Sequence, residues 1–184
     1  EDAIICGTAF VDEVFRQLDP GVTVNWLVSD GDPVTPDQVL CSLDGKARSL
    51  LTGERAALNF LQTLSGTATV TGTYVNAIGN STTRLLDTRK TLPGLRLAQK
   101  YAVICGGGLN HRVGLYDAFL IKENHIHAAG SISAAVTAAR ELAPDILLEV
   151  EVETFDQLKE CLECGVKRIL LDNFSLEQLR EAVS

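Results

Sequence analysis

The sequence contains no methionine, no block of like charge and no long apolar run. A helix that spans a bilayer needs roughly 20 consecutive apolar residues, and the chain also lacks the charged and apolar segments that open a secretory signal. Its net charge of -8 argues against a surface that neutralises nucleic-acid phosphates. We therefore expect a cytoplasmic protein that binds neither membranes nor nucleic acid.

The length of 184 residues suits one ordinary domain, or one domain with part of another. The chain begins without methionine in the strand-like run Ala3–Cys6 and stops inside a helical pattern at Ala182–Ser184. These two features indicate an internal portion of a longer protein. Because 46% of the residues are apolar and no segment is of low complexity, we expect it to be globular.

The cysteines are odd in number and lie in apolar contexts, which favours reduced, buried thiols. Cys161 and Cys164 form a C-x-x-C motif within a helical pattern, without a second pair of ligands nearby. We therefore interpret them as residues of a helix face, not as a metal or redox site. His125 and His127 lack the i, i+4 spacing of a helical zinc site.

The first 50 residues or so indicate short strands, turns and one helix. Strands are predicted within Val22–Val28 and Val39–Leu43, and a short helix over Phe10–Leu18. A long helix then follows, with Thr52 as its predicted N-cap and leucines at helical spacing. Arg55 lies in the first turn of that predicted helix, where position alone favours a solvated side chain.

From Thr83 onward strands alternate with helices. The predicted strands are Arg84–Leu86, Ala118–Ile121, Ile146–Val152 and Arg168–Leu171; the predicted helices are Leu95–Cys105 and three that begin after Ser131, Thr154 and Ser175. Thr154 and Ser175 are each followed by glutamine three residues later, which is the pattern of a capping box. A complete (β/α)₈ barrel needs eight such units and about 250 residues. We therefore predict an α/β fold, with an N-terminal α+β domain at residues 1–80 and part of an incomplete β/α barrel at residues 81–184.

Cationic side chains follow successive strands of this pattern. Arg89 and Lys90 come after one apolar run, His111 and Arg112 follow a glycine run, and Lys122 closes another strand. In parallel α/β folds the carboxyl ends of strands line the active site. Each cation alone suits an ordinary surface, but several at successive loops indicate a site for an anion with adjacent carboxylates, which arginine binds in a bidentate fork.

Acidic side chains end the later strands. Glu149, Glu151 and Glu153 alternate along one strand and therefore share a face, and Asp172 ends the next strand. Three buried carboxylates are costly without partners, so we expect the last of them to reach the open end of the sheet. There a metal or ribose hydroxyls could pair with them. Asp172 also suits the start of a helix.

Several motifs together resemble one family, quinolinate phosphoribosyltransferase, over nearly the whole chain. The motifs are GERAALNF at residues 53–60, LDTRKTLPG at 86–94, KYAV at 100–103, GGGLNHR at 106–112, LIKENH at 120–125, EVEVE at 149–153 and LDNF at 171–174. The resemblance implies an N-terminal sandwich-like α/β domain followed by an incomplete β/α barrel. It also implies conversion of quinolinate and phosphoribosyl pyrophosphate, with Mg²⁺, to nicotinate mononucleotide, carbon dioxide and pyrophosphate.

The resemblance also implies roles for particular residues. Quinolinate would be held by a set of polar and cationic side chains: Thr88, Arg89, Lys90, His111, Arg112 and Lys122. Glu151 and Asp172 would face the ribose and the metal-bound pyrophosphate, and with Lys90 and Lys122 they form the implied catalytic set. Arg55 would enter the active site of the neighbouring subunit of a homodimer, which reverses the interpretation of Arg55 from position alone.

The family's later barrel strands, whose glycine-rich loops bind the 5′-phosphate, have no counterpart here, so normal binding of phosphoribosyl pyrophosphate is not expected of this chain. Two other functions stay open at the level of sequence. One is a related phosphoribosyltransferase for another small aromatic acid. The other is a catalytically silent binding module, against which the intact sets of cations and carboxylates argue.

Overall fold

The computed structural model describes residues 1–184, which form two compact units, Glu1–Val113 and Gly114–Ser184. Each unit is described by itself. The predicted domain boundary between residues 80 and 81 stays a prediction.

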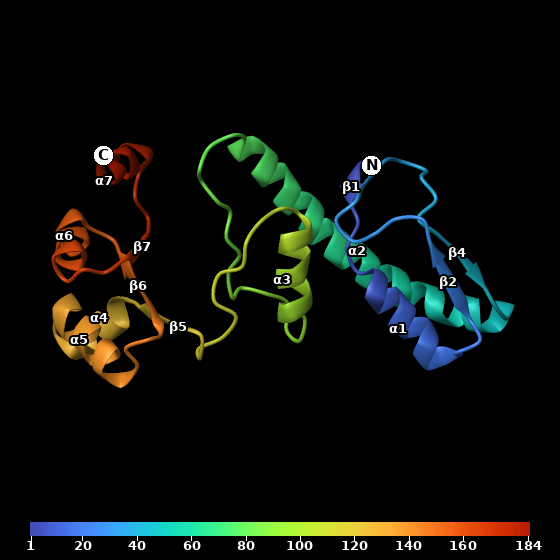
Figure 1. The fold of residues 1–184 in the computed structure, drawn as a ribbon, viewed down its shortest axis with the longest axis horizontal. Coiled ribbons are helices and arrows are strands. Elements are labelled where there is room, and N and C mark those ends of the chain that lie inside the picture. The colour runs from blue at the N-terminus through green and yellow to red at the C-terminus, as the bar shows by residue number, and fades with distance from the viewer. The chain divides into compact units, whose positions relative to one another are not determined.

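The first unit is organised along one long helix. Helix α2 (Ala47–Ile78) packs against α1 (Thr8–Leu18) on one side and against α3 (Arg96–Cys105) nearer its carboxyl end (Figure 1). The contact with α1 buries Phe15, and the contact with α3 buries Leu64. The long helix therefore connects the N-terminal strands to α3 and the loops around it.

Four short strands complete the N-terminal part of this unit. Strand β1 (Ala3–Ile4) pairs with β3 (Pro33–Val34), and β2 (Thr23–Trp26) pairs with β4 (Cys41–Asp44), both antiparallel. The strand predicted within Val22–Val28 is confirmed in shorter form, and the one predicted at Val39–Leu43 is confirmed with its start two residues later and its end one residue later. The predicted first helix begins two residues earlier than expected.

The predicted start of the long helix was wrong. Helix α2 begins at Ala47, with Lys46 at its N-cap position. Thr52 lies inside the helix, where its hydroxyl donates to the Arg48 carbonyl at 2.7 Å. A threonine hydroxyl can bond one turn back within a helix as well as cap it, so the residue type did not distinguish the two positions. Arg55 is consequently in the third turn of α2, and it is exposed.

The predicted strand at Arg84–Leu86 is reduced to one parallel bridge between Leu86 and Leu109. The Leu109 amide donates to the Leu85 carbonyl at 2.9 Å, and the Asp87 amide donates to the Leu109 carbonyl at 3.1 Å. The ladder between the two segments does not extend beyond this bridge, so the apolar run forms no longer strand.

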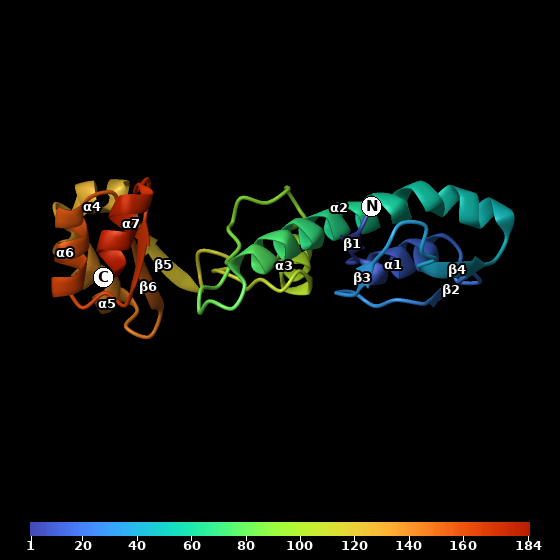
Figure 2. The same cartoon turned by 90° about the horizontal axis from the view of Figure 1, so that it is seen from above.

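The second unit is a parallel sheet covered by helices. The strands lie in the order β5 (Ala118–Ile121), β6 (Leu147–Val152) and β7 (Arg168–Leu171), which confirms the predicted β/α pattern. Figures 1 and 2 show helices on one face of this sheet; the four helices of the unit are α4 (Glu123–Ala129), α5 (Ile132–Leu142), α6 (Phe155–Glu163) and α7 (Leu176–Val183). The core between sheet and helices includes Val150 and Val152 of β6 and Val136 of α5.

Helix α4 was not predicted from the sequence. It has 7 residues and buries none of them completely, so it leaves no apolar periodicity to detect. None of the helices in the chain is both long and apolar enough to pass through a membrane.

The helix caps of the second unit largely follow the sequence. Ser131 accepts a hydrogen bond from the Ala134 amide at 3.0 Å, and Ser175 with Gln178 forms the predicted capping box. At α6 the Thr154 hydroxyl accepts from the Gln157 amide, but Gln157 Oε1 accepts from the Glu153 amide, one residue before the N-cap. The second half of that predicted box was therefore wrong.

Two glycines give a matched test of the packing between α2 and α3. A Cβ on Gly106 would lie 2.4 Å from the Ala68 carbonyl oxygen, whereas a Cβ on Gly66 would meet nothing within 4 Å. We expect Gly106→Ala to lower the free energy of unfolding by about 1–3 kcal/mol. We expect Gly66→Ala to raise it by about 0.5–1 kcal/mol, because alanine favours a helix interior. Urea denaturation measures both, and equal effects of the two variants would contradict the close contact.

Candidate active site

Two loops that carry predicted site residues meet in the first unit. One loop, residues 87–91, holds Thr88, Arg89 and Lys90; the other, residues 109–113, holds His111 and Arg112. Leu86, which precedes the one loop, and Leu109, which begins the other, form a parallel bridge, so the two loops start side by side. These five residues, separate in the sequence, therefore lie on adjacent loops.

Asp87 connects the two loops. Its Oδ1 accepts a hydrogen bond from the His111 amide at 2.8 Å and also pairs with Lys100 Nζ. Lys100 Nζ donates in turn to the His111 carbonyl at 3.0 Å. In the amide orientation that satisfies its neighbours, Asn110 donates to Asp87 Oδ2 at 2.7 Å and to the Lys100 carbonyl at 2.9 Å.

A pocket of about 210 Å³ opens between α2, α3 and the first loop. Thr88 and Lys90 are among its lining residues, together with Thr67 of α2 and Gln99 of α3. The Thr88 hydroxyl oxygen accepts from the Lys90 amide at 3.0 Å, so the loop turns tightly and presents both side chains to the pocket. The Lys90 cation at its wall makes this pocket suitable for an anion.

Arg89 carries a buried donor without a partner. Its Nε atom is shielded from solvent and makes no hydrogen bond, although buried polar atoms in proteins are nearly always paired. The Arg89 guanidinium carries its charge next to Lys90 in the sequence and on the loop beside His111, so cationic groups gather at this place.

Arg55 is far from this pocket along the same helix. It precedes Thr67, which lines the pocket, by 12 positions in one continuous helix. At 1.5 Å per residue that separation is about 18 Å along the axis. An arginine side chain is much shorter than this distance, so the structure does not bring Arg55 to the other predicted residues of its own unit.

The second unit brings together a different part of the predicted set. Lys122 directly follows β5, Glu151 lies near the end of β6, and Asp172 directly follows β7. The strand register and the bond from the Asp172 amide to the Val152 carbonyl at 2.9 Å place all three at the carboxyl edge of the sheet. Lys122 Nζ donates to Glu151 Oε2 at 2.6 Å, and the Glu151 side chain is only 12% exposed.

The acids of β6 differ in burial along the strand. Val150 and Val152 belong to the core under the helices, so Glu149 and Glu151 point to the opposite face. Glu149 is buried, Glu151 is half-buried and Glu153 is exposed. The expectation that the later acids reach the open end of the sheet is confirmed.

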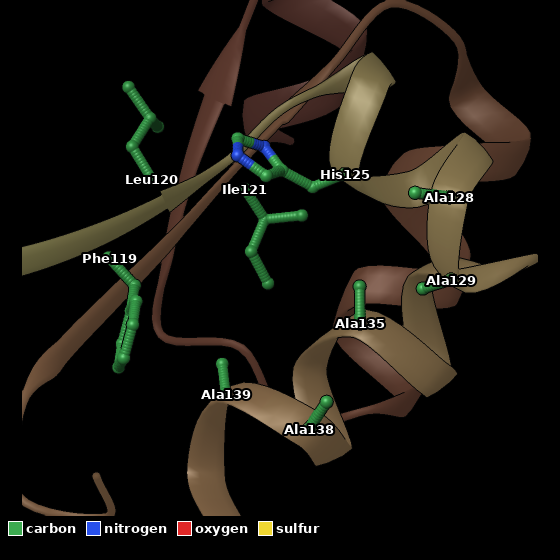
Figure 3. Close-up of a pocket in the computed structure, with 9 residues that line it drawn as sticks. All are labelled: Phe119, Leu120, Ile121, His125, Ala128, Ala129, Ala135, Ala138 and Ala139. Carbon is green, nitrogen blue, oxygen red and sulfur yellow. The ribbon is translucent and has the colours of Figure 1, made fainter. Parts of the chain in front are cut away.

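A larger pocket in the second unit lies apart from these acids. It measures about 390 Å³ and is lined by β5, α4 and α5, with alanines along the helices and His125 at one side (Figure 3). His125 Nδ1 accepts a hydrogen bond from the Lys122 amide at 3.0 Å. The lining is almost wholly apolar, so this pocket lacks the donors that an anion requires.

The structure contains no cluster of three or more metal-ligating side chains. Cys161 lies on α6 and its side chain is buried in the core. Burial is the main cause that raises its pKa to about 11, and the neighbouring Cys164 is the second. All five cysteines are free. A protonated, buried thiol agrees with the interpretation of the C-x-x-C motif as part of a helix face.

Comparison with known proteins identifies the family of the chain. Residues 1–65 match the family profile "Quinolinate phosphoribosyl transferase, N-terminal domain", and residues 67–184 match the profile of the C-terminal domain. The chain belongs to the quinolinate phosphoribosyl transferase family. Its members include enzymes named nicotinate-nucleotide pyrophosphorylase [carboxylating].

Relatives of known sequence and structure extend beyond this chain. A probable nicotinate-nucleotide pyrophosphorylase of Synechocystis is 44% identical over all 184 residues, which span 62% of that protein. The Mycobacterium leprae enzyme is 47% identical over 94% of the chain and 60% of its own length. The structure of the Francisella tularensis nicotinate-nucleotide pyrophosphorylase matches with a TM-score of 0.97 and 52% identity, covering the whole chain and 65% of that structure. The chain thus spans less than two thirds of these family members.

Sequence reasoning missed the residues that hold the loops. Asp87 and Lys100 stood inside the LDTRKTLPG and KYAV motifs of the family, but no role was predicted for either, and Arg96 was not considered. The sequence carried no signal for Lys100, because a lysine in a helix is usually exposed and its burial against Asp87 shows only in the tertiary structure.

The raised pKa of Cys161 predicts low reactivity. Burial raises that pKa from 9.0 to about 11 and so disfavours the thiolate. At pH 9 the folded chain would hold only about 1% of Cys161 as thiolate, against about half in the unfolded chain. We expect iodoacetamide to alkylate Cys161 at least about 50-fold more slowly in the native protein than in 8 M urea. Peptide mass spectrometry follows the reaction, and similar rates in the two states would contradict a buried thiol.

Proposed function

We propose that the complete protein containing this chain converts quinolinate and phosphoribosyl pyrophosphate to nicotinate mononucleotide, carbon dioxide and pyrophosphate in NAD biosynthesis. The observation that carries the proposal is the junction of the two loops through Asp87, which sets the cationic residues next to one another in a chain of this family. We also propose that the parallel sheet is part of an incomplete β/α barrel and that the protein works in the cytoplasm.

The cations are assigned to the two carboxylates of quinolinate. Arg89 has an unpaired donor, Lys90 lines the pocket, and Arg112 lies on the adjacent loop with His111. Two adjacent carboxylates at neutral pH need several fixed positive charges, and arginine binds each carboxylate through two parallel hydrogen bonds. A substrate with one carboxylate would leave part of this set unpaired, which favours the dicarboxylate.

In the proposed reaction the pyridine nitrogen forms a bond to C1 of the ribose while the bond from C1 to pyrophosphate breaks. Positive charge develops on the sugar during this exchange. Glu151 and Asp172 are assigned to orient the ribose hydroxyls and to stabilise that charge. Lys122 is assigned to quinolinate, and its 2.6 Å bond to Glu151 fixes the rotamers of both side chains.

The second step removes the 2-carboxylate as carbon dioxide. Its bonding electrons enter the pyridinium ring, which is electron-poor because the nitrogen is now quaternary, and a proton from solvent then takes the vacant ring position. A poorly solvated carboxylate loses carbon dioxide more readily, so Arg89 and its neighbours need only hold the ring and exclude water.

The carboxylates fit a metal that is held mainly by the substrate. Glu151 is already paired with Lys122, and Asp172 accepts from Asn173 Nδ2 at 3.0 Å. This set is too small for an all-protein cage, but Mg²⁺ is usually bound through one or two carboxylates, waters and phosphate oxygens. When bound, Mg²⁺ would neutralise charge on the leaving pyrophosphate, with Asp172 and Glu151 as direct or water-mediated ligands.

Arg55 is assigned to the active site of the other subunit in a homodimer. Its position about 18 Å along α2 from the pocket supports this assignment, because it is too distant to reach the pocket of its own unit. It is also exposed and has no ion pair within the chain.

The decisive test offers the full-length protein phosphoribosyl pyrophosphate and Mg²⁺ with either quinolinate or nicotinate, and follows nicotinate mononucleotide and released carbon dioxide. Product from quinolinate alone supports the proposal. Product from nicotinate alone, or from neither acid, contradicts it.

Arg112→Ala tests the assignment to quinolinate. We expect the Kd of quinolinate, measured by calorimetry on the full-length protein, to rise at least about 100-fold while the circular dichroism spectrum stays that of the wild type, because a bidentate cation is lost. Arg84→Ala is the matched control, since Arg84 is exposed and bonds only the nearby carbonyls of Ser81 and Thr83. Unchanged affinity in the Arg112 variant would exclude it from the substrate site.

Arg55→Ala tests the shared site. We expect this variant alone, and Arg112→Ala alone, to be almost inactive as homodimers. Mixed after dissociation and reassociation, they should regain up to about one quarter of wild-type activity, because half of the dimers are hybrids and one site in each hybrid has both arginines. Activity assays on the mixture provide the measurement, and a mixture as inactive as its components would contradict the proposed dimer.

A further inference from the structure

Helix α3 presents two cations to the loops described above. Arg96 and Lys100 are four residues apart, so they lie on the same face of the helix. Each contacts both loops: residues 87–91, here called the first loop, and residues 109–113, the second loop. Neither cation has a role in the proposed reaction.

Lys100 makes the more buried contact. Its side chain is 2% exposed and pairs with Asp87 of the first loop, whose side chain is 6% exposed. The same Nζ donates to the His111 carbonyl of the second loop at 3.0 Å. Asp87 reaches across as well, because its Oδ1 accepts from the His111 amide at 2.8 Å. The backbone of His111 is therefore held on both its amide and its carbonyl side.

Arg96 makes a similar connection nearer the start of α3. Its Nη2 donates to the Arg89 carbonyl of the first loop at 3.5 Å, and its Nη1 donates to the Val113 carbonyl of the second loop at 3.4 Å. Its Nε donates to the Thr91 hydroxyl at 3.4 Å. Arg96 and Lys100 together contact the backbone of Arg89 and His111 and that of Val113, next to Arg112.

We infer that Lys100 and Arg96 are positioning residues, which hold the two loops at a fixed spacing so that Arg89 and Arg112 can bind both carboxylates of one dicarboxylate. The inference rests on the proposed function, because it specifies how the quinolinate site is built.

Lys100 is not a further substrate ligand. Its ammonium group is shielded from solvent, and it pairs with a carboxylate of the protein and donates to a carbonyl. Asp87 neutralises the Lys100 charge, so the net positive charge toward a ligand comes from the loop residues. Although Lys100 is among the residues that line the pocket, its donors point to Asp87 and His111.

The spacing of the loops matters most for a ligand with two carboxylates. A dicarboxylate binds tightly only when the cations on both loops are correctly placed at the same time, whereas a monocarboxylate can be held by one loop. Loosening the connection should therefore weaken quinolinate binding more than nicotinate binding. A loss of stability alone would weaken the two by the same factor.

The test compares Lys100→Met with the wild type in the full-length protein. We expect the Kd of quinolinate to rise at least about tenfold and the ratio of quinolinate to nicotinate affinity to fall at least about fivefold, both measured by calorimetry. In the ligand-free protein we expect the His111 amide, which donates to Asp87, to exchange with deuterium at least about tenfold faster.

Arg96→Met is the second variant, because loss of the buried Lys100 could prevent folding. We expect it to lower the same affinity ratio at least about threefold. Arg140→Met is its matched control: Arg140 also donates to two carbonyls, those of Cys164 and Gly165, but at a place distant in sequence from both loops. Ser65→Ala controls for stability, since Ser65 is buried and its hydroxyl accepts from the Cys6 amide and donates to the Cys6 carbonyl, both outside the two loops.

Failure of the inference and failure of the proposed function give different results. If the wild type binds quinolinate and both α3 variants keep its affinity ratio, Lys100 and Arg96 do not position the site and the inference is overturned. If the wild type binds no quinolinate, the proposed function fails, and with it the role in dicarboxylate recognition. In that case the exchange rate of the His111 amide alone decides whether Lys100 holds the second loop.

Discussion

A buried charge must be paired, and in this protein the pair formed by Lys100 and Asp87 decides where two loops can lie. Both side chains are almost fully shielded from water, and removing one member of such a pair typically costs about 3–5 kcal/mol. Because Asp87 begins one loop and bonds the backbone of His111 in the other, the requirement to satisfy one charge also fixes the backbone of the other loop. This pair, together with the bridge between Leu86 and Leu109 and the bonds of Arg96, holds the loops that carry the cations.

Close backbone packing makes the pair possible. Gly106, the C-cap of α3, lies so near to α2 that a Cβ there would be 2.4 Å from the Ala68 carbonyl oxygen. A Cβ on Gly108 would lie 2.7 Å from a methyl carbon of Val103. These two glycines are therefore required by close packing. They let the chain leave α3 beside α2 and return to bridge Leu86 through Leu109. His111 comes two residues after Leu109, so the bridge also places His111 close to Asp87.

The second unit uses the general geometry of a parallel sheet instead of a buried network. Lys122, Glu151 and Asp172 share an edge because parallel strands end on the same side, and the alternation along β6 sends Val150 into the core and Glu151 away from it. Lys122 then pairs with Glu151 at 2.6 Å, which satisfies a carboxylate that is mostly shielded from solvent. The anion site proposed at the loops of the first unit and the hydroxyl or metal site proposed at this edge thus depend on different physical features.

Local pattern determined most of the elements. The strands Ala118–Ile121 and Arg168–Leu171 and the caps at Ser131 and Ser175 could be read from the sequence because each depends on residues a few positions apart. The motifs also identified the family and named the cations and acids of the candidate site.

Helix α4 and the true start of α2 could not be read, because neither leaves a distinct local signal. Only the tertiary structure decided that Lys100 is buried against Asp87, that Arg96 joins the same two loops and that Arg55 lies too far along α2 to meet them. Those facts depend on contacts between residues distant in sequence, which packing fixes and local spacing does not encode.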